Sequence, residues 1–262
     1  MSKMDKFGLG KALNDIEDKN TSYLTANVPV YARLDGKNFS KFTRDMQKPY
    51  DQKFSDIMID TMKKLVKNMN ATMGYTQSDE ISLYWENSTN IQNEMMFGGK
   101  KEKMIGELSG LATAYFISQI MKHFPDKVDS LPRFDCRIFN CSKDDAGDFF
   151  RWRQIDATKN SISVMASTYL NAKSLNSISC YDRRTMLRDI NKPWEAMPQS
   201  FKSGVFASRF IRKSKINAFS PYDGIYMEER NVILPYTRNI TGIPVGRDVF
   251  DFHENEISEI LS

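Results

Sequence analysis

The chain has 262 residues, 40% hydrophobic and 12% aromatic, enough for one large domain or two small ones with a sizeable buried core. Charged residues make up 27% and the net charge is +4, which are ordinary values for a soluble protein. No apolar run approaches the roughly 20 residues that span a bilayer, and the N-terminus lacks the apolar segment of a secretion signal, so neither a membrane nor an exported protein is expected.

Cysteine usage and basic clusters bear on location and partners. Three cysteines without a CxxC pair indicate a reducing compartment, so we expect a cytoplasmic protein whose thiols pack as small hydrophobic groups. Basic clusters suit phosphate-bearing partners, although each cluster taken alone is equally typical of a solvated face. These clusters are Lys37/Lys41/Arg44/Lys48, Lys100/Lys101/Lys103 and Arg209/Arg212/Lys213/Lys215.

The first predicted elements are a helix, a strand, a helix and a hairpin. A short helix is expected over 8–19, and the alternating, β-branched residues 27–35 predict a strand. After a loop over 36–50, Asp51 is a suitable N-cap for a helix whose apolar residues recur at three and four positions as far as Met69. Strands over 71–76 and 81–85 follow so closely that they predict a hairpin.

The remaining elements continue this mixed pattern. A loop over 87–99 precedes an apolar helix over 101–123, which Pro125 ends, and a strand over 133–141. Residues 144–170 predict one long helix or two, and 181–190 another. Two strands over 203–211 and 226–235 predict a hairpin with a long charged connection, ahead of an acidic tail at 251–262. The aromatic residues Trp152 and Tyr115 are interpreted as core residues rather than stacking platforms.

The order β-α-β-β-α-β is that of the split βαβ, ferredoxin-like fold, so the predicted class is α+β. We expect a catalytic core with its N-terminal helix over 1–142 and a mixed helical and strand extension over 143–262 packed on it. In such an antiparallel sheet the first and third strands are adjacent. The end of the first strand, with Asp35, is therefore predicted to lie beside Asp79 and Glu80 at the start of the third.

Converging carboxylates repel one another unless a divalent cation lies between them. Mg²⁺ prefers oxygen ligands and accepts substrate phosphates, and two such ions about 4 Å apart assist phosphoryl transfer. Gly36 would let the backbone approach the ion, the N–H groups of residues 36–40 can bind phosphate, and Lys48 and Lys103 supply positive charge. An Asp-Gly or Ser-Asp-Glu segment alone is a common turn or cap, so the interpretation depends on their joint placement.

Four segments together resemble the tRNA(His) guanylyltransferase superfamily. They are Arg33-Leu-Asp-Gly-Lys-Asn-Phe-Ser-Lys-Phe42, Gln77-Ser-Asp-Glu80, Phe134-Asp-Cys-Arg137 and Trp152-Arg-Gln-Ile-Asp156. The superfamily comprises guanylyltransferases and Thg1-like relatives, which are template-dependent 3′-to-5′ polymerases. The resemblance runs from about residue 23 to 170 and implies a polymerase-palm-like core, in agreement with the predicted topology.

The resemblance also implies roles for individual residues. Asp35 and Asp79 would be the metal-binding, catalytic carboxylates, with the Gly36 carbonyl as a further ligand and Glu80 as a supporting acid. Nucleotide contacts are implied for Gly36, Lys37, Asn38, Phe39, Lys48, Asp51, Ser78, Lys103 and Arg137. Asn160 is assigned to RNA by resemblance, and Arg209, Arg212, Lys213 and Lys215 by charge alone.

Two departures favour the Thg1-like branch. Thr158-Lys-Asn-Ser161 stands where the guanylyltransferase branch has His-Ile-Asn-Asn, and Ser40 stands where it has His. We therefore expect a cytoplasmic enzyme that uses two Mg²⁺ ions, ATP or GTP and nucleoside triphosphates to extend the 5′ end of truncated tRNA under template direction. By resemblance it is expected to be a homotetramer. The alternatives are a guanylyltransferase that adds G to tRNA(His), a palm-fold nucleotide cyclase and a non-catalytic RNA-binding module.

Overall fold

A computed structural model describes residues 8–86, 95–216, 226–241, 243, 249–250, 252 and 254–261. Its α-helices are α1 Leu9–Lys19, α2 Phe39–Phe42, α3 Gln52–Asn68, α4 Lys101–His123, α5 Lys143–Tyr169, α6 Cys180–Asp189, α7 Gln199–Ser203 and α8 Glu254–Leu261. Its 3-10 helices are η1 Met96–Gly99, η2 Pro125–Ser130, η3 Ala172–Leu175 and η4 Trp194–Ala196. Its strands are β1 Val30–Lys37, β2 Met73–Gln77, β3 Glu80–Trp85, β4 Arg133–Asn140, β5 Val205–Ile216 and β6 Tyr226–Tyr236.

The strands form one six-stranded sheet in the order β4-β1-β3-β2-β5-β6, with every neighbouring pair antiparallel. The predicted βαββαβ core is confirmed, because β1 lies between β3 and β4 and pairs Asp35 with Glu80. The extension contributes β5 and β6 to the same sheet through the pairing of β2 with β5. The division at residue 142 remains a prediction, although no break in the sheet marks it.

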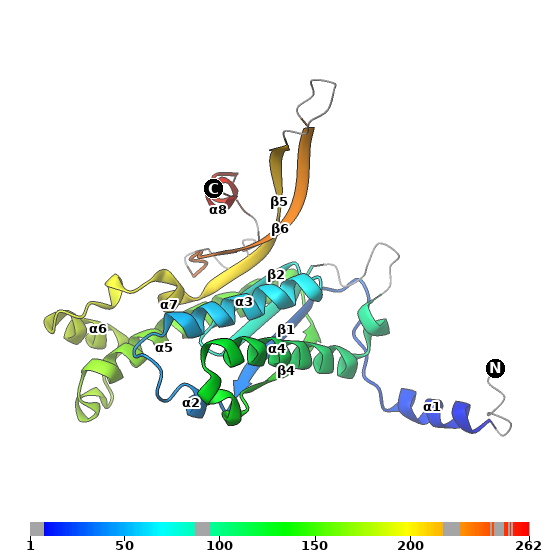
Figure 1. Ribbon diagram of the computed structural model, residues 1–262, viewed down its shortest axis with the longest axis horizontal. Coiled ribbons are helices and arrows are strands. Elements are labelled where there is room, and N and C mark those ends of the chain that lie inside the picture. The colour runs from blue at the N-terminus through cyan, green and yellow to red at the C-terminus, as the bar shows by residue number, and fades with distance from the viewer. Residues whose placement is uncertain are drawn as a thin grey trace.

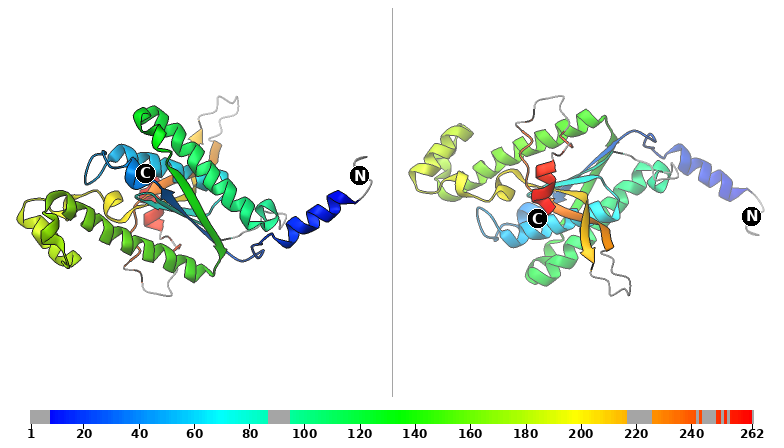
Figure 2. Two further views of the ribbon diagram at one scale, coloured as in Figure 1. Left: turned by 90° about the horizontal axis from the view of Figure 1, so that it is seen from below. Right: turned by 90° about the horizontal axis from the view of Figure 1, so that it is seen from above.

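Helices cover both faces of the sheet, with α3 and α4 on one side and α5 on the other (Figures 1 and 2). Alternation along β1 explains this, since Val30, Ala32 and Leu34 join the core beneath α3 and α4. Tyr31 points the other way and stacks on Phe149 of α5, with ring centroids 4.9 Å apart. Alternate side chains of β1 are therefore buried on opposite faces of the sheet.

Helix boundaries follow local chemistry closely. The Asp51 carboxylate accepts a hydrogen bond of 3.0 Å from the Phe54 N–H and caps α3, as predicted. Ser142 and Asp145 form a capping box at the start of α5, which is one helix of 27 residues rather than two. At its other end, α4 stops at His123, just before Pro125.

Three expectations differ from the structure. The strand predicted over 27–35 is shifted to 30–37, because Gly36 and Lys37 pair with the start of β4, so Asp35 lies within the strand. The loop expected over 36–50 contains the short helix α2. The Trp152 side chain is 50% exposed rather than in the core.

The remaining predictions fall partly outside the described residues. The charged connection between β5 and β6 lies there, as does most of the loop predicted over 87–99. The acidic tail is helical over Glu254–Leu261. All three cysteines are free and half-buried. Among the residues described, no helix is long and apolar enough to cross a membrane.

Candidate active site

The carboxylates predicted to converge do meet where β1 and β3 lie side by side. Asp35 pairs in register with Glu80, and Asp79 occupies the preceding two-residue turn. Gly36 lies so close to Asp79 that a Cβ built there would be 2.7 Å from the Asp79 Cβ and 2.8 Å from its Oδ2. Any side chain at position 36 would therefore displace the carboxylate.

The two segments that carry these acids each include a residue in the left-handed region. Ser78 in the turn has φ 54°, and Asn38, which follows Gly36 by two residues, has φ 71°. Such conformations are uncommon for residues other than glycine and cluster at functional sites. The Ser78 hydroxyl donates a 3.1 Å hydrogen bond to Asp79 Oδ1, which helps to fix the carboxylate.

Burial and charge perturb both acids that follow the turn. Burial raises the pKa of Asp79, and the negative charge of Asp35 raises it further. Burial also raises the pKa of Glu80, while Arg153 and Arg33 oppose that shift. Arg153 Nε donates to Glu80 Oε1 at 2.5 Å, so Glu80 has a cation as partner. Among the described residues no ion pair reaches Asp79, which is half-buried, so a bound cation would offset its charge.

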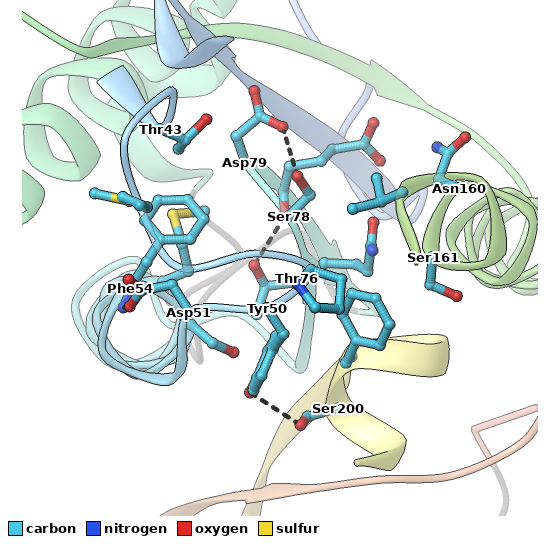
Figure 3. Close-up of a pocket in the computed structure, with 18 of the residues that line it drawn as sticks. Thr43, Tyr50, Asp51, Phe54, Thr76, Ser78, Asp79, Asn160, Ser161 and Ser200 are labelled. Carbon is cyan, nitrogen blue, oxygen red and sulfur yellow. Dashed lines mark hydrogen bonds between the residues drawn. The ribbon is translucent and has the colours of Figure 1, made fainter. Parts of the chain in front are cut away.

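A cavity of about 510 Å³ opens beside these acids (Figure 3). The loop between α2 and α3 supplies Tyr50, α5 supplies Asn160 and α7 supplies Ser200, while Ser78 and Asp79 come from the β2–β3 turn (Figure 3). Its lining combines acids and hydroxyl groups with apolar side chains. The apolar side chains include Met46, Phe54, Met58, Ile59, Val164, Phe201 and Val205. That combination suits a ligand with an apolar ring and a charged, polar part.

Several predicted nucleotide and RNA residues line this cavity. They are Lys48, Asp51, Ser78 and Asn160, together with the carboxylates Asp35, Asp79 and Glu80. Lys48 Nζ donates to the Thr43 carbonyl at 3.2 Å and is otherwise exposed. The Asn160 amide donates to Asp156 at 3.3 Å.

Other predicted residues lie elsewhere. Gly36, Lys37, Asn38 and Phe39 are next to the acids but do not line the cavity, and the Phe39 ring is 2% exposed in the core. Only the backbone of Phe39 is therefore available to a ligand.

Lys103 is not brought to the site. It lies in the first turn of α4, close to Tyr23 and Lys100, whereas Asp35 lies at the far end of β1. Arg137 is exposed on β4 opposite Arg33, on the sheet face that α5 partly covers.

The predicted basic cluster on β5 is described only in part. The Arg209 guanidinium donates to the carbonyls of Val66 and Lys67 at 3.1 Å each, and so caps the end of α3. Arg212, Lys213 and Lys215 belong to the backbone of β5, but their side chains lie outside the described part of the structure.

Sequence reasoning missed Arg153 and the α7 wall of the cavity. Arg153 lies within the Trp152–Asp156 segment, but its partner Glu80 is 73 residues away in sequence, and no local pattern pairs them. Tyr50 reaches Ser200 across 150 residues, with 3.3 Å between the two hydroxyl oxygens. Only the position of α7 against the core brings these groups together.

The donor set fits a hard divalent cation. Among the described residues no group of three or more His, Cys, Asp or Glu side chains gathers as a metal site. Asp35, Asp79 and the backbone at Gly36 nevertheless provide oxygen atoms of the type Mg²⁺ prefers, with room for substrate oxygens. The tight contact of Gly36 with Asp79 holds that carboxylate against the backbone.

Comparison with known protein families gives a match over half of the chain. The family model described as "Thg1: tRNAHis guanylyltransferase" matches residues 10–142. The tRNA(His) guanylyltransferase of Schizosaccharomyces pombe is 29% identical over 137 residues, which cover 51% of this chain and 51% of that enzyme. The match thus spans about half the length of this curated relative.

Solved structures match over a larger share. A bacterial tRNA(His) guanylyltransferase (Thg1)-like protein in complex with ATP superposes with a TM-score of 0.72 and 31% identity, covering 77% of this chain and 87% of that one. The corresponding protein in complex with GTP gives a TM-score of 0.65 and 28% identity, with 77% and 86% covered. The likeness therefore extends well beyond the segment that the family model matches.

Proposed function

The chain belongs to the Thg1 family, the tRNAHis guanylyltransferases, and from that membership we propose that it is a nucleotidyltransferase acting on the 5′ end of tRNA. The observation that carries the proposal is the contact between Gly36 and Asp79 beside Asp35, at the edge of the cavity. Paired carboxylates beside a nucleotide-sized cavity are what phosphoryl transfer requires. ATP or GTP is the proposed cavity ligand, supported by the bacterial relatives bound to these nucleotides.

The protein's own residues would position the reactants. Asp35, Asp79 and the Gly36 carbonyl would hold Mg²⁺, which when bound supplies positive charge to phosphate oxygens and acidifies an attacking hydroxyl. Lys48 at the cavity rim would contact triphosphate oxygens. Arg153 neutralises Glu80 and thereby limits the negative charge that an incoming triphosphate meets.

The reaction that we propose is template-directed repair. The 5′-monophosphate of truncated tRNA attacks the α-phosphorus of ATP, which forms an adenylylated 5′ end and releases pyrophosphate. The 3′-hydroxyl of the incoming nucleoside triphosphate then attacks the tRNA phosphorus, which forms the phosphodiester bond and releases AMP and the hydroxyl proton. The segment Thr158–Ser161 supports this branch, because it lacks the His-Ile-Asn-Asn sequence of the guanylyltransferase branch. We place the reaction in the cytoplasm.

A gel assay tests the proposal. A 5′-monophosphorylated tRNA lacking its first nucleotide is incubated with Mg²⁺, ATP and each nucleoside triphosphate in turn. Extension only by the nucleotide that pairs with the opposing strand is expected. Addition of G whatever the opposing base would support the guanylyltransferase alternative, and no extension would leave a nucleotide cyclase or a binding module.

The Asp35→Ala variant tests the metal assignment within the same assay. We expect nucleotide addition to fall by at least about 100-fold, because electrostatic stabilisation by a single group is worth that much. Binding of tRNA, measured by filter retention, should remain largely intact. Turnover like that of the unmodified protein would refute the assignment of Asp35.

A further inference from the structure

Trp152 is an exposed aromatic residue near the start of α5, where the neighbouring Phe149 and Phe150 pack into the core. Phe150, two positions earlier, is fully buried, whereas the Trp152 side chain is 50% exposed. Trp152 does not line the cavity proposed for the nucleoside triphosphate, although its neighbour Arg153 does. The indole therefore lies outside that cavity.

The indole is connected to the catalytic carboxylates through Arg153. The Arg153 guanidinium carbon lies 4.5 Å from the centroid of the Trp152 ring and so supports the ring from one side. The same guanidinium donates to Glu80 at 2.5 Å and to Asp156 at 2.9 Å, which fixes its plane. Trp152 is consequently a rigid aromatic surface close to the pair formed by Asp35 and Glu80.

The sheet surface next to this platform carries like charges in facing pairs. Arg33 faces Arg137 across the β1–β4 ladder and Lys37 faces Arg133, and the acidic pair of Asp35 and Asp135 lies between them on the same face. Like charges directly opposite one another destabilise a sheet, so each such pair favours a ligand of opposite charge. All four basic side chains are exposed or half-exposed and lie on the α5 face. The Arg33–Arg137 pair therefore suits a phosphate of a nucleic-acid strand whose reacting end lies at the neighbouring acids.

We propose that Trp152 is a stacking platform for the terminal base of the RNA strand whose 5′ end is extended. The proposal rests on the proposed function, since it names how that substrate is held. One ring face is supported by Arg153, and the exposed part of the indole accepts the base while Arg33 and Arg137 contact the adjoining phosphates. Base stacking on aromatic residues tolerates any sequence, as an enzyme guided by a template requires.

Kinetics of three variants test the platform. Trp152→Ala is expected to raise the KM for tRNA about 5- to 100-fold, with kcat and the KM for the nucleoside triphosphate little changed. Trp152→Phe should restore most of the affinity because it keeps an aromatic face. Ile155→Ala is the matched control, since Ile155 is 37% exposed on the same helix but has no ring.

A binding measurement separates this proposal from the proposed function. The tRNA carries 2-aminopurine as its 5′-terminal nucleotide, and its fluorescence is expected to be quenched by the unmodified protein and by Trp152→Phe, but not by Trp152→Ala. If no nucleotide is added to any RNA while this quenching pattern holds, the proposed activity fails and the platform stands. Equal quenching and equal KM in Trp152→Ala would overturn the platform. A lower oligomer mass of that variant, with unchanged RNA affinity, would instead assign Trp152 to a subunit contact.

Discussion

At the scale of single residues, the carboxylate of Asp79 lowers the stability of the fold at the position that we propose for a metal ligand. Its pKa is raised from the ordinary value of 3.8 by burial and by the charge of Asp35. As the pH rises from this ordinary value toward the raised pKa in the folded protein, the Asp79 carboxyl loses its proton first in the unfolded chain. Ionisation of Asp79 therefore favours unfolding. The folded protein thus loses stability to keep a carboxylate charged beside Gly36, as expected of a site prepared for a cation.

Replacing Asp79 by Asn tests this cost. Without divalent cations, Asp79→Asn should raise the Tm at pH 7 by about 2–4 °C for each kcal/mol recovered, and the difference should vanish below about pH 3.8. Millimolar Mg²⁺ should raise the Tm of the unmodified protein but not of the variant. Thermal unfolding followed by circular dichroism at pH 3.5 and 7 measures both effects. A variant less stable at pH 7 would contradict the assigned sign.

Gly36 offers a second test of the contact between the two site segments. In Gly36→Ala the new methyl group would lie 2.6 Å from Phe39 Cδ2 and 2.8 Å from Asp79 Oδ2, so nucleotide addition should fall at least 10-fold as these side chains move. Gly110→Ala is the control, because nothing lies within 4 Å of a Cβ at that position of α4. It should add about 0.5–1 kcal/mol of stability without changing turnover. Steady-state rates and urea unfolding compare the two variants, and an active Gly36→Ala enzyme would refute the tight contact.

At the scale of elements, Asp51 joins a helix terminus to the cavity. Its carboxylate caps α3 and also lines the space proposed for the nucleotide. Asn is as good an N-cap as Asp, whereas Ala is not. Substitution can therefore separate the two roles.

Asp51→Asn should keep the stability of the unmodified protein, while Asp51→Ala should lose about 0.5–2 kcal/mol in urea unfolding. If the carboxylate also contacts the nucleotide, both variants should raise the KM for the activating nucleotide, because both lack the charge. A normal KM in Asp51→Asn would limit the residue to capping.

Helices and the local hairpin could be predicted because their determinants are local. The apolar period of α3, the Asp51 cap and the short gap before Glu80 are all readable within a few residues. Pairing of β2 with β5 could not be predicted, since backbone hydrogen bonds carry no sequence label and Thr76 meets Val205 over a long separation. The Arg153 contact with Glu80 was missed for the same reason.

At the scale of the whole molecule, the sheet unites the predicted core and its extension. One side of the core strands is covered by side chains from beyond residue 142. Tyr31 contacts Phe149 and Phe150, and Tyr75 donates a 2.9 Å hydrogen bond to the Ser203 carbonyl. The core strands alone would expose these tyrosines to water.

A fragment of residues 1–142 tests this interdependence. We expect it to lack a cooperative thermal transition and to bind a hydrophobic dye, because the aromatic cluster that includes Tyr31 and Tyr75 would have lost its cover. The intact chain should unfold in a single transition with coincident far- and near-ultraviolet signals. An independently folded fragment would instead support a true domain boundary at residue 142.

The two-residue turn between Gln77 and Glu80 also limits where the chain can accept inserted residues during evolution. Side chains alternate along a strand, so one added residue there would turn Glu80 and its followers to the wrong face or carry Asp79 away from Gly36. Insertions at the tip of a hairpin are ordinarily among the changes that proteins tolerate best. In this chain we expect selection to remove insertions in the β2–β3 turn, and related sequences to differ in length in other loops.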